Sequence, residues 1–236
     1  MECKVSTMEK LVMELGIDMT KRKNYLVFGG SGSIGSECCA ILQEYGDVIS
    51  ISSNLENFEE LINSVESFSG IIWAQGINVS DSIHDFDQKV FQRVFDANVS
   101  YILNTLVVLI ENQKVAPRAQ LLIISSVWSG LSKPNKLSYS VSKSAINGIV
   151  RDLSIEFGDR GVCVNSLSPG PIDSIMTRTN LSDKELSRIV SETPLKRLLS
   201  ISEVASAACT IIKGELFGVT GQDIVMDGGW SVTKLV

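Results

Sequence analysis

Histidine is almost absent from this sequence, since His84 is the single example in 236 residues. A Ser-His-Asp triad, or a metal site built from several histidines, would have to depend on that one residue. His84 stands among Asp81, Asp85 and Asp87, a polar setting typical of a solvated loop. We therefore expect no metal site.

Cysteine patterns that would indicate disulfides or redox motifs are also missing. The cysteines are five in number, which is odd, and none forms a C-x-x-C pair. Cys38 and Cys39 are neighbours, poorly placed to bridge each other. This usage favours a reducing compartment, and we expect a cytoplasmic protein.

The sequence has neither an excess of basic charge nor a long hydrophobic run. The net charge is −6, so no strong positive field gathers nucleic acid or anionic lipid. The longest apolar stretch, 101–110, is interrupted by Asn104 and Thr105 and is too short to span a bilayer. Residues 1–20 mix charged with apolar side chains and do not resemble a signal peptide. We expect neither a membrane nor a nucleic-acid partner.

What is present is an ordinary globular composition, with 44% hydrophobic and 20% charged residues. A chain of this length can bury a sizeable core. We expect residues 24–236 to form one domain, preceded by an N-terminal extension at residues 1–23.

Short apolar runs without two-residue alternation recur along the chain, separated by longer segments of helical periodicity. Such runs are typical of strands that are buried on both faces. The order of strand and helix predicts an α/β fold with a doubly wound, mostly parallel sheet of six or seven strands. The runs are residues 25–28, 48–51, 70–74, 121–124, 162–167 and 224–226.

A glycine cluster lies between the first predicted strand and the first predicted helix, residues 34–45. Glycine allows a backbone to approach a pyrophosphate, which the positive end of the following helix attracts. This position predicts dinucleotide binding. The candidate contacts are Gly29, Ser31, Gly32, Ser33, Ile34 and Gly35.

Polar residues interrupt the apolar stripes of two predicted helices. Asn98 lies in the stripe of residues 89–111, where a buried amide needs hydrogen-bond partners. Tyr139 and Lys143 lie one turn apart at the start of the stripe of residues 139–157. Other polar clusters follow the predicted strands, and the carboxyl ends of parallel strands meet at one edge, where ligands bind.

With these motifs the sequence resembles the short-chain dehydrogenase/reductase family, in its compact single-domain branch. Tyr139 and Lys143 match the family's Tyr-x-x-x-Lys, and Ser126 precedes Tyr139 by the customary 13 positions. Asn98 matches the helix asparagine that completes the family's tetrad. The resemblance covers about residues 24–230 and implies a Rossmann-type fold.

The resemblance also implies an activity and a site. Tyr139 would be the general acid for ketone reduction and the base for oxidation of a secondary alcohol, with NAD(P) as cofactor. Lys143 would lower the pKa of the phenol and hold the nicotinamide ribose, while Ser126 would bond the carbonyl oxygen and Asn98 would support a water chain. Further cofactor contacts would be Ser52, Asn54, Ala74, Gly76, Pro169, Gly170, Ile172 and Ser174. Relatives commonly form homodimers or homotetramers through the helices of Asn98 and Tyr139.

Several positions depart from the family pattern. Phe28 replaces the customary threonine, Ser33 replaces a glycine, and the Asn-Asn-Ala-Gly motif reads Trp-Ala-Gln-Gly at residues 73–76. Only about 20 residues separate Ser52 from Trp73, so one element of the family fold is expected to be missing or collapsed. The second strand ends without the carboxylate that holds an NAD ribose, which favours NADP(H) over NAD(H).

Two other functions remain open. The altered motifs allow a catalytically silent dinucleotide-binding sensor or scaffold, although the whole tetrad is retained. A sugar-nucleotide epimerase or dehydratase fits the glycine spacing, but no substrate domain follows Trp230. The substrate, a small carbonyl compound or alcohol, is left undefined. Residues 131–137 and 175–191 should border its pocket, with Trp128 and Met176 as candidate apolar walls.

Overall fold

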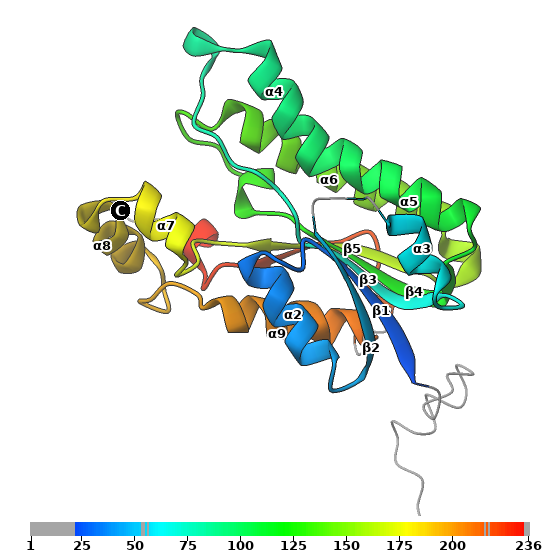
Figure 1. The fold of residues 1–236 in the computed structure, drawn as a ribbon. Helices are drawn as coiled ribbons and strands as arrows, with labels where there is room; N and C mark the ends of the chain where they lie inside the picture. Colours follow the sequence, from blue (N-terminus) through cyan, green and yellow to red (C-terminus); the bar gives the residue numbers. More distant parts are fainter. Residues whose placement is uncertain (1–21, 53–54, 56, 215, 217, 234–236) are drawn as a thin grey trace, which may run out of the picture.

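The computed structural model describes residues 22–52, 55, 57–214, 216 and 218–233 (Figure 1). Most of the predicted N-terminal extension, residues 1–21, lies outside these residues, as does the predicted cofactor contact Asn54. The first strand, β1, begins at Lys23.

Six strands form one parallel sheet in the order β2-β1-β3-β4-β5-β6. The predicted α/β class and the mostly parallel sheet are thus confirmed. Every predicted apolar run overlaps a strand, although Ala74 and Val162 at the ends of two runs lie outside β3 and β5. Their bounds are β1 Lys23–Phe28, β2 Gly46–Ile51, β3 Phe68–Trp73, β4 Val115–Ile124, β5 Cys163–Pro169 and β6 Asp223–Met226.

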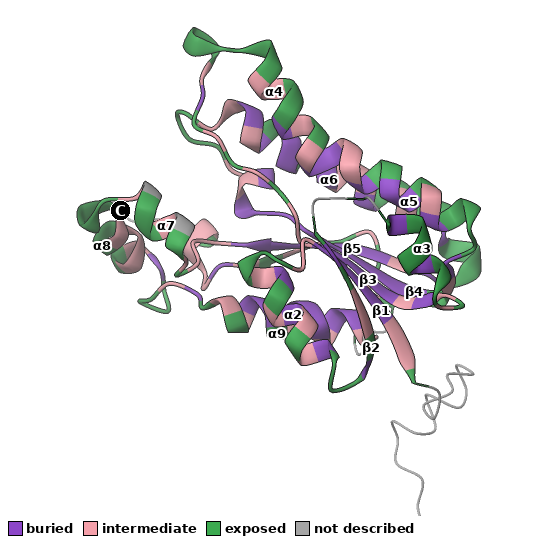
Figure 2. Ribbon diagram, in the orientation of Figure 1, coloured by how far each residue is buried: buried purple, intermediate pink, exposed green. Residues whose placement is uncertain are grey.

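Helices cover both faces of the sheet (Figure 1). On one face α2 (Ser33–Leu42) and α9 (Ile201–Ile212) enclose a core with β-strand residues such as Val27 and Leu122. On the other face lie α3 (Phe58–Asn63), α4 (Gln88–Phe95), α5 (Tyr101–Glu111) and α6 (Leu137–Glu156). Figure 2 shows that the central strands and the sheet-facing sides of these helices are largely buried. Two smaller helices, α7 (Ile175–Asn180) and α8 (Asp183–Glu192), lie beyond the carboxyl ends of the strands.

The helical segment Gln88–Glu111 is long and apolar enough, by length and composition alone, to cross a membrane. Its inward face carries Val94, Ile102 and Leu109, which are fully or almost fully buried in the molecule. An apolar core helix of a layered fold can pass the same test, so length and composition alone say nothing further about a membrane.

The sheet ends at β2, which leaves this strand at an edge. Between β2 and β3 the described chain contains one helix, α3, where the family resemblance implies an additional helix and strand. The expectation of a missing element is therefore met, and the sheet has the smaller of the two predicted strand numbers.

The unusual residues Phe28 and Trp73 stack on each other at the carboxyl ends of β1 and β3. Their ring centroids lie 5.5 Å apart with an interplanar angle of 12°, and Phe58 and Tyr101 meet the other sides of Phe28. The Trp73 indole donates a 2.9 Å hydrogen bond to the Thr105 hydroxyl. An aromatic cluster thus replaces the polar brace of the family, and the two departures compensate each other.

Candidate active site

The glycine turn after β1 packs directly against the turn after β3. Gly29 has a φ of +76°, and a Cβ there would lie 2.6 Å from the Gln75 backbone nitrogen. A Cβ at Gly35 would lie 2.2 Å from the Gly29 carbonyl oxygen. Both positions therefore require glycine, because no side chain fits between the backbones. The turn itself is fixed by the Gly32 amide, which donates to the Gly29 carbonyl at 2.9 Å.

This turn leads into the ten-residue helix α2, whose N-terminus has no side-chain cap. The N-cap residue is Gly32, and no acidic residue stands in the first turn. Ser31, Gly32 and Ser33 are exposed and Ile34 is half-buried. Uncapped amide donors at a positive helix end suit a pyrophosphate, so the residues present fit a dinucleotide.

Asn98 lies in a π-helical segment, Asp96–Ser100, between α4 and α5. Its amide accepts from the Ile77 backbone nitrogen at 2.8 Å and donates to the Ile77 carbonyl at 3.0 Å and to the Ser142 hydroxyl at 2.9 Å. The predicted core-facing position is confirmed, and these three hydrogen bonds hold the chain after β3 against α6. A Cβ at Gly76 would lie 3.0 Å from the Asn98 oxygen and 3.6 Å from the Lys143 nitrogen, so three predicted residues meet here.

Ser126, Tyr139 and Lys143 lie together at the carboxyl end of β4. The Ser126 side chain lies next to the Tyr139 phenol and favours its ionised form. The Lys143 ammonium is 5.7 Å from the centroid of the Tyr139 ring and donates to the Ile124 carbonyl at 2.9 Å. The structure therefore brings together the four residues of the predicted tetrad.

The electrostatics of Tyr139 differ from the prediction. Burial raises the pKa of the phenol, and the neighbouring Ser126 offsets only part of this rise. Burial also lowers the pKa of the Lys143 ammonium to about 8. The prediction that Lys143 lowers the pKa of Tyr139 is wrong for this structure, because desolvation dominates and the ammonium is directed to the Ile124 carbonyl.

The chain after β5 completes the same edge. The Gly170 amide donates to the Met226 carbonyl at 2.8 Å, and a Cβ at Gly170 would lie 2.5 Å from that of Asp227. Pro169 ends β5, and Ile172 forms an isolated bridge with Leu199. Ser174, however, caps α7 by accepting from the Thr177 amide at 3.2 Å, so its hydroxyl already has a structural role.

The remaining predicted contacts lie at the ends of β2 and β3. The Ser52 carbonyl accepts a 3.4 Å hydrogen bond from the Tyr101 hydroxyl, and the Ala74 amide donates to the Phe28 carbonyl at 2.9 Å. Next to Ala74, both polar atoms of the Gln75 side chain are buried and have no hydrogen-bond partner. Gln75 was missed as a site residue, although its place in the altered Trp-Ala-Gln-Gly motif was a signal.

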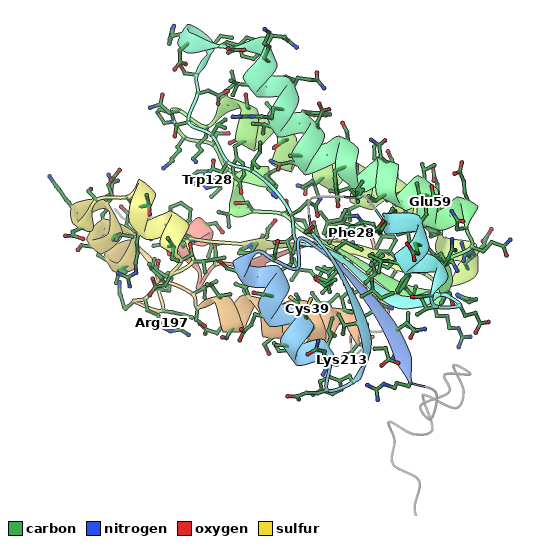
Figure 3. All side chains as sticks on the ribbon, viewed as in Figure 1. Phe28, Cys39, Glu59, Trp128, Arg197 and Lys213 are labelled. Carbon is green, nitrogen blue, oxygen red and sulfur yellow. The ribbon has the colours of Figure 1, made fainter. Side chains whose placement is uncertain are left out.

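A small cavity of about 260 Å³ lies among Leu131, Glu192, Trp230, Ser231 and Thr233. The Trp230 ring meets the Trp128 ring edge to face at 5.7 Å. Figure 3 labels Trp128 on the turn that follows β4. Leu131 and Trp128, an expected border and an expected apolar wall of the substrate pocket, thus lie near the same cavity. The side chain of Met176, the other expected wall, is outside what the structure describes. Trp230 was missed because it stands far along the chain.

Comparison with known proteins gives a consistent result. Residues 33–231 match the family model described as enoyl-(acyl carrier protein) reductase. The 3-oxoacyl-[acyl-carrier-protein] reductase FabG of Rickettsia typhi is 29% identical over 240 residues, covering 90% of this chain and 98% of that protein. A solved short chain dehydrogenase family protein from Francisella tularensis aligns with a TM-score of 0.81 at 26% identity, covering 90% of this chain and all of that one.

The chain belongs to the short-chain dehydrogenase/reductase family. Glucose 1-dehydrogenase 2 of Bacillus subtilis, 26% identical over 81% of this chain and 78% of that protein, is a further relative. As a short-chain dehydrogenase/reductase, the protein is an NAD(P)-dependent oxidoreductase that interconverts a secondary alcohol and a ketone. Its Rossmann-type fold is the one expected from the sequence.

Proposed function

We propose that Tyr139 is the general acid of ketone reduction and the general base of alcohol oxidation. The observation that carries this proposal is that the Ser126 side chain and the Lys143 ammonium both lie beside Tyr139 at the carboxyl edge of the sheet. A carbonyl oxygen that accepts from both hydroxyls would gain a proton from Tyr139 while Ser126 stabilises its growing negative charge.

Lys143 and Asn98 support this pair in different ways. With a pKa of about 8, Lys143 is protonated in most molecules at neutral pH, and its ammonium, which lies beside Gly76, would hold the nicotinamide ribose. Asn98 holds the Ile77 peptide and thereby keeps Gly76 beside Lys143. The roles of the tetrad are thus divided between proton transfer and support.

The dinucleotide would bind along the same edge. The α2 N-terminus and the turn at residues 29–35 would hold its pyrophosphate, and Gly76, Lys143, Pro169 and Gly170 would border its nicotinamide half. When bound, the cofactor supplies or accepts a hydride. NADP(H) is favoured over NAD(H) because no carboxylate follows β2 in Ser52-Ser53 to repel a 2′-phosphate.

A 3-oxoacyl thioester is the substrate class that the relatives suggest first. The Rickettsia typhi relative is named a 3-oxoacyl-[acyl-carrier-protein] reductase. In the cavity between Leu131 and Trp230, these two side chains, with the Trp128 ring beside Trp230, would contact an acyl chain, while Glu192, Ser231 and Thr233 give the cavity a polar side. In this proposal the physiological reaction is reduction of the 3-oxo group.

Cofactor oxidation by the purified protein tests this function. The absorbance of NADPH or NADH is followed with a panel of carbonyl compounds that includes acetoacetyl-coenzyme A, a soluble 3-oxoacyl thioester. The proposal expects carbonyl-dependent oxidation, faster with NADPH. Binding of NADPH by fluorescence without any turnover would favour the silent sensor, and conversion without net cofactor oxidation would favour an epimerase or dehydratase.

Assembly and location complete the proposal. The outer faces of α5 and α6 expose Val107, Ile110 and Ile155, which supports pairing of two copies through these helices. The four cysteines of the described chain are free thiols, which suits a cytoplasmic enzyme.

A further inference from the structure

Asp223, at the start of β6, accepts hydrogen bonds from three serine hydroxyls. Ser166 and Ser168 donate to its Oδ1 at 2.8 Å and 2.6 Å, and Ser129 donates to its Oδ2 at 2.9 Å. Ser166 and Ser168 are fully buried and Ser129 is 9% exposed. Hydrogen bonds to a carboxylate are stronger than those between neutral groups, so this cluster is a firm link between β5, β6 and the turn after β4.

Ser129 stands at the end of the turn that begins at Ser126. The Ser129 amide donates to the Ser126 carbonyl at 2.8 Å, and the Trp128 amide donates to the Ser126 hydroxyl at 3.4 Å. Ser126 is attached to β4 on one side, while Asp223 holds the other end of the turn. The direction of the Ser126 hydroxyl therefore depends on where Asp223 places Ser129.

The same turn is joined to the helix that carries Tyr139. The Ser144 hydroxyl donates to the Ser129 carbonyl at 2.9 Å, and Ser144 directly follows Lys143 in α6. Ser129 thus contacts β6 through its side chain and α6 through its backbone. This double contact sets the turn of Ser126 relative to the helix of Tyr139.

We infer that Asp223 is a positioning residue of the active site, which acts through Ser129 to keep the Ser126 hydroxyl on the Tyr139 hydroxyl. This inference rests on the proposed roles of Ser126 and Tyr139. Asp223 contacts neither Ser126 nor Tyr139. It acts on Ser126 through Ser129, at the other end of the short turn. Neither Asp223 nor Ser129 belongs to the tetrad.

The matched pair Ser129→Ala and Ser166→Ala tests the inference. Each removes one hydroxyl from the same carboxylate, but only Ser129 lies on the Ser126 turn. Both variants should lose similar stability, since each deletes one buried hydrogen bond to a charged group. If positioning matters, only Ser129→Ala should change the chemistry of Tyr139.

The first readout is the titration of the Tyr139 phenol, measured by tyrosinate absorbance as the difference between each variant and its own Tyr139→Phe counterpart. Ser126 beside the phenol lowers the pKa of Tyr139, so moving Ser126 away should shift the titration to higher pH. We expect that shift in Ser129→Ala and the wild-type curve in Ser166→Ala. Identical curves in Ser129→Ala and wild type, or equal shifts in both variants, would overturn the inference.

The second readout is turnover with NADPH and acetoacetyl-coenzyme A, or the best carbonyl compound of the panel. Ser129→Ala should lower kcat about tenfold and leave the KM for NADPH unchanged, because the displaced Ser126 affects the reacting atoms and not the cofactor. Asp223→Asn should lower kcat as well, and Ser129→Ala should then add little. Additive losses would contradict the link through Ser129.

Ser126→Ala separates failure of this inference from failure of the proposed function. If Ser126→Ala retains wild-type kcat, the proposed role of Ser126 is wrong. The Tyr139 titration still decides whether Asp223 positions Ser126. If Ser126→Ala loses activity and Ser129→Ala does not, the proposed function stands and the inference falls.

Discussion

At the scale of one residue, Lys143 is a side chain of the active site whose burial lowers the stability of the fold. The side chain is buried at 4% exposure, and its pKa falls to about 8, whereas a free lysine has a pKa of about 10.4. Holding this amine in the core therefore opposes folding at neutral pH, when it carries a proton. Active sites commonly contain groups that the rest of the fold must stabilise.

We predict that Lys143→Met makes the protein more stable and inactive. Between about pH 8 and 10.4 the unfolded chain binds more protons than the folded one, so wild-type stability rises with pH over this window. Below about pH 8 the free-energy cost of burying the charged amine has its full value, about 3 kcal/mol at most. The hydrogen bond to the Ile124 carbonyl offsets part of this cost. Urea unfolding should show a gain of about 1 kcal/mol at pH 7 that disappears near pH 10.5.

The exposed Lys89 provides the control for this prediction. Lys89→Met should leave the free energy of unfolding nearly unchanged at both pH values. A loss of stability in Lys143→Met at pH 7, or a gain independent of pH, would show that burial does not disfavour the ammonium.

Residue identities in the tetrad were predictable because their spacing is specific, but their electrostatics were not. The proximity of Tyr139 and Lys143 along one helix suggests a direct effect of the amine on the phenol. Only the tertiary structure reveals that burial of the phenol outweighs this effect and that the Lys143 ammonium donates its hydrogen bond to the Ile124 carbonyl. Desolvation depends on residues distant in sequence, and no local spacing encodes it.

At the scale of elements, the stacked pair Phe28 and Trp73 fastens β1 to β3 close to the glycine turn. Both residues looked like isolated departures from a family pattern, because the sequence does not place them side by side. The register of the parallel pair does so, since Phe28 and Trp73 are direct partners. The two substitutions thus form one structural unit.

We predict that the two rings are energetically coupled. Phe28→Leu and Trp73→Leu should each lower the free energy of unfolding by about 2 kcal/mol, and the double variant should lose about 1 kcal/mol less than the sum. Urea unfolding of the four proteins measures this coupling. The pair Phe68→Leu and Trp73→Leu, whose rings stand at opposite ends of β3, should be additive. Additivity in the first pair would contradict the stacked arrangement.

Strand positions followed well from the apolar runs, but irregular elements did not. The first half of β4 contains Pro117 and Arg118, the latter at a φ of +60°, and here the register with β3 shifts. The π-helical segment at Asn98 was hidden, because its residues continue the helical stripe on either side. A single extra residue in a helical turn changes the backbone hydrogen bonding, but it barely changes the spacing of the apolar residues along the sequence.

At the scale of the whole molecule, the parallel sheet brings the polar residues of distant segments together at one edge. The fold class could be predicted from alternating strands and helices, and the family resemblance then supplied the site. The six-strand sheet and its open edge at β2 followed in part from the short distance between Ser52 and Trp73. The exposure of residues on the outer faces of the helices is harder to predict from the sequence, because it depends on how the helices pack.

We predict that the protein self-associates through α5 and α6. Val107, on α5, is 52% exposed, and a charge there would be buried without a partner in such an interface. Sedimentation should find a dimer or tetramer for the wild type and mainly the 25.7 kDa monomer for Val107→Glu. Ile83→Glu, at an exposed position outside these helices, should retain the wild-type assembly. A wild-type protein that sediments only as a monomer would refute the prediction.

The measurement that tests the account most directly is carbonyl-dependent NADPH oxidation by Tyr139→Phe. Loss of the only proposed proton donor should lower kcat by at least about 10³-fold, while fluorescence titration finds NADPH binding near the wild-type affinity. Tyr45→Phe, which changes an exposed tyrosine, should keep full activity and serves as the control. Wild-type turnover in Tyr139→Phe would contradict the central claim that this phenol exchanges the proton.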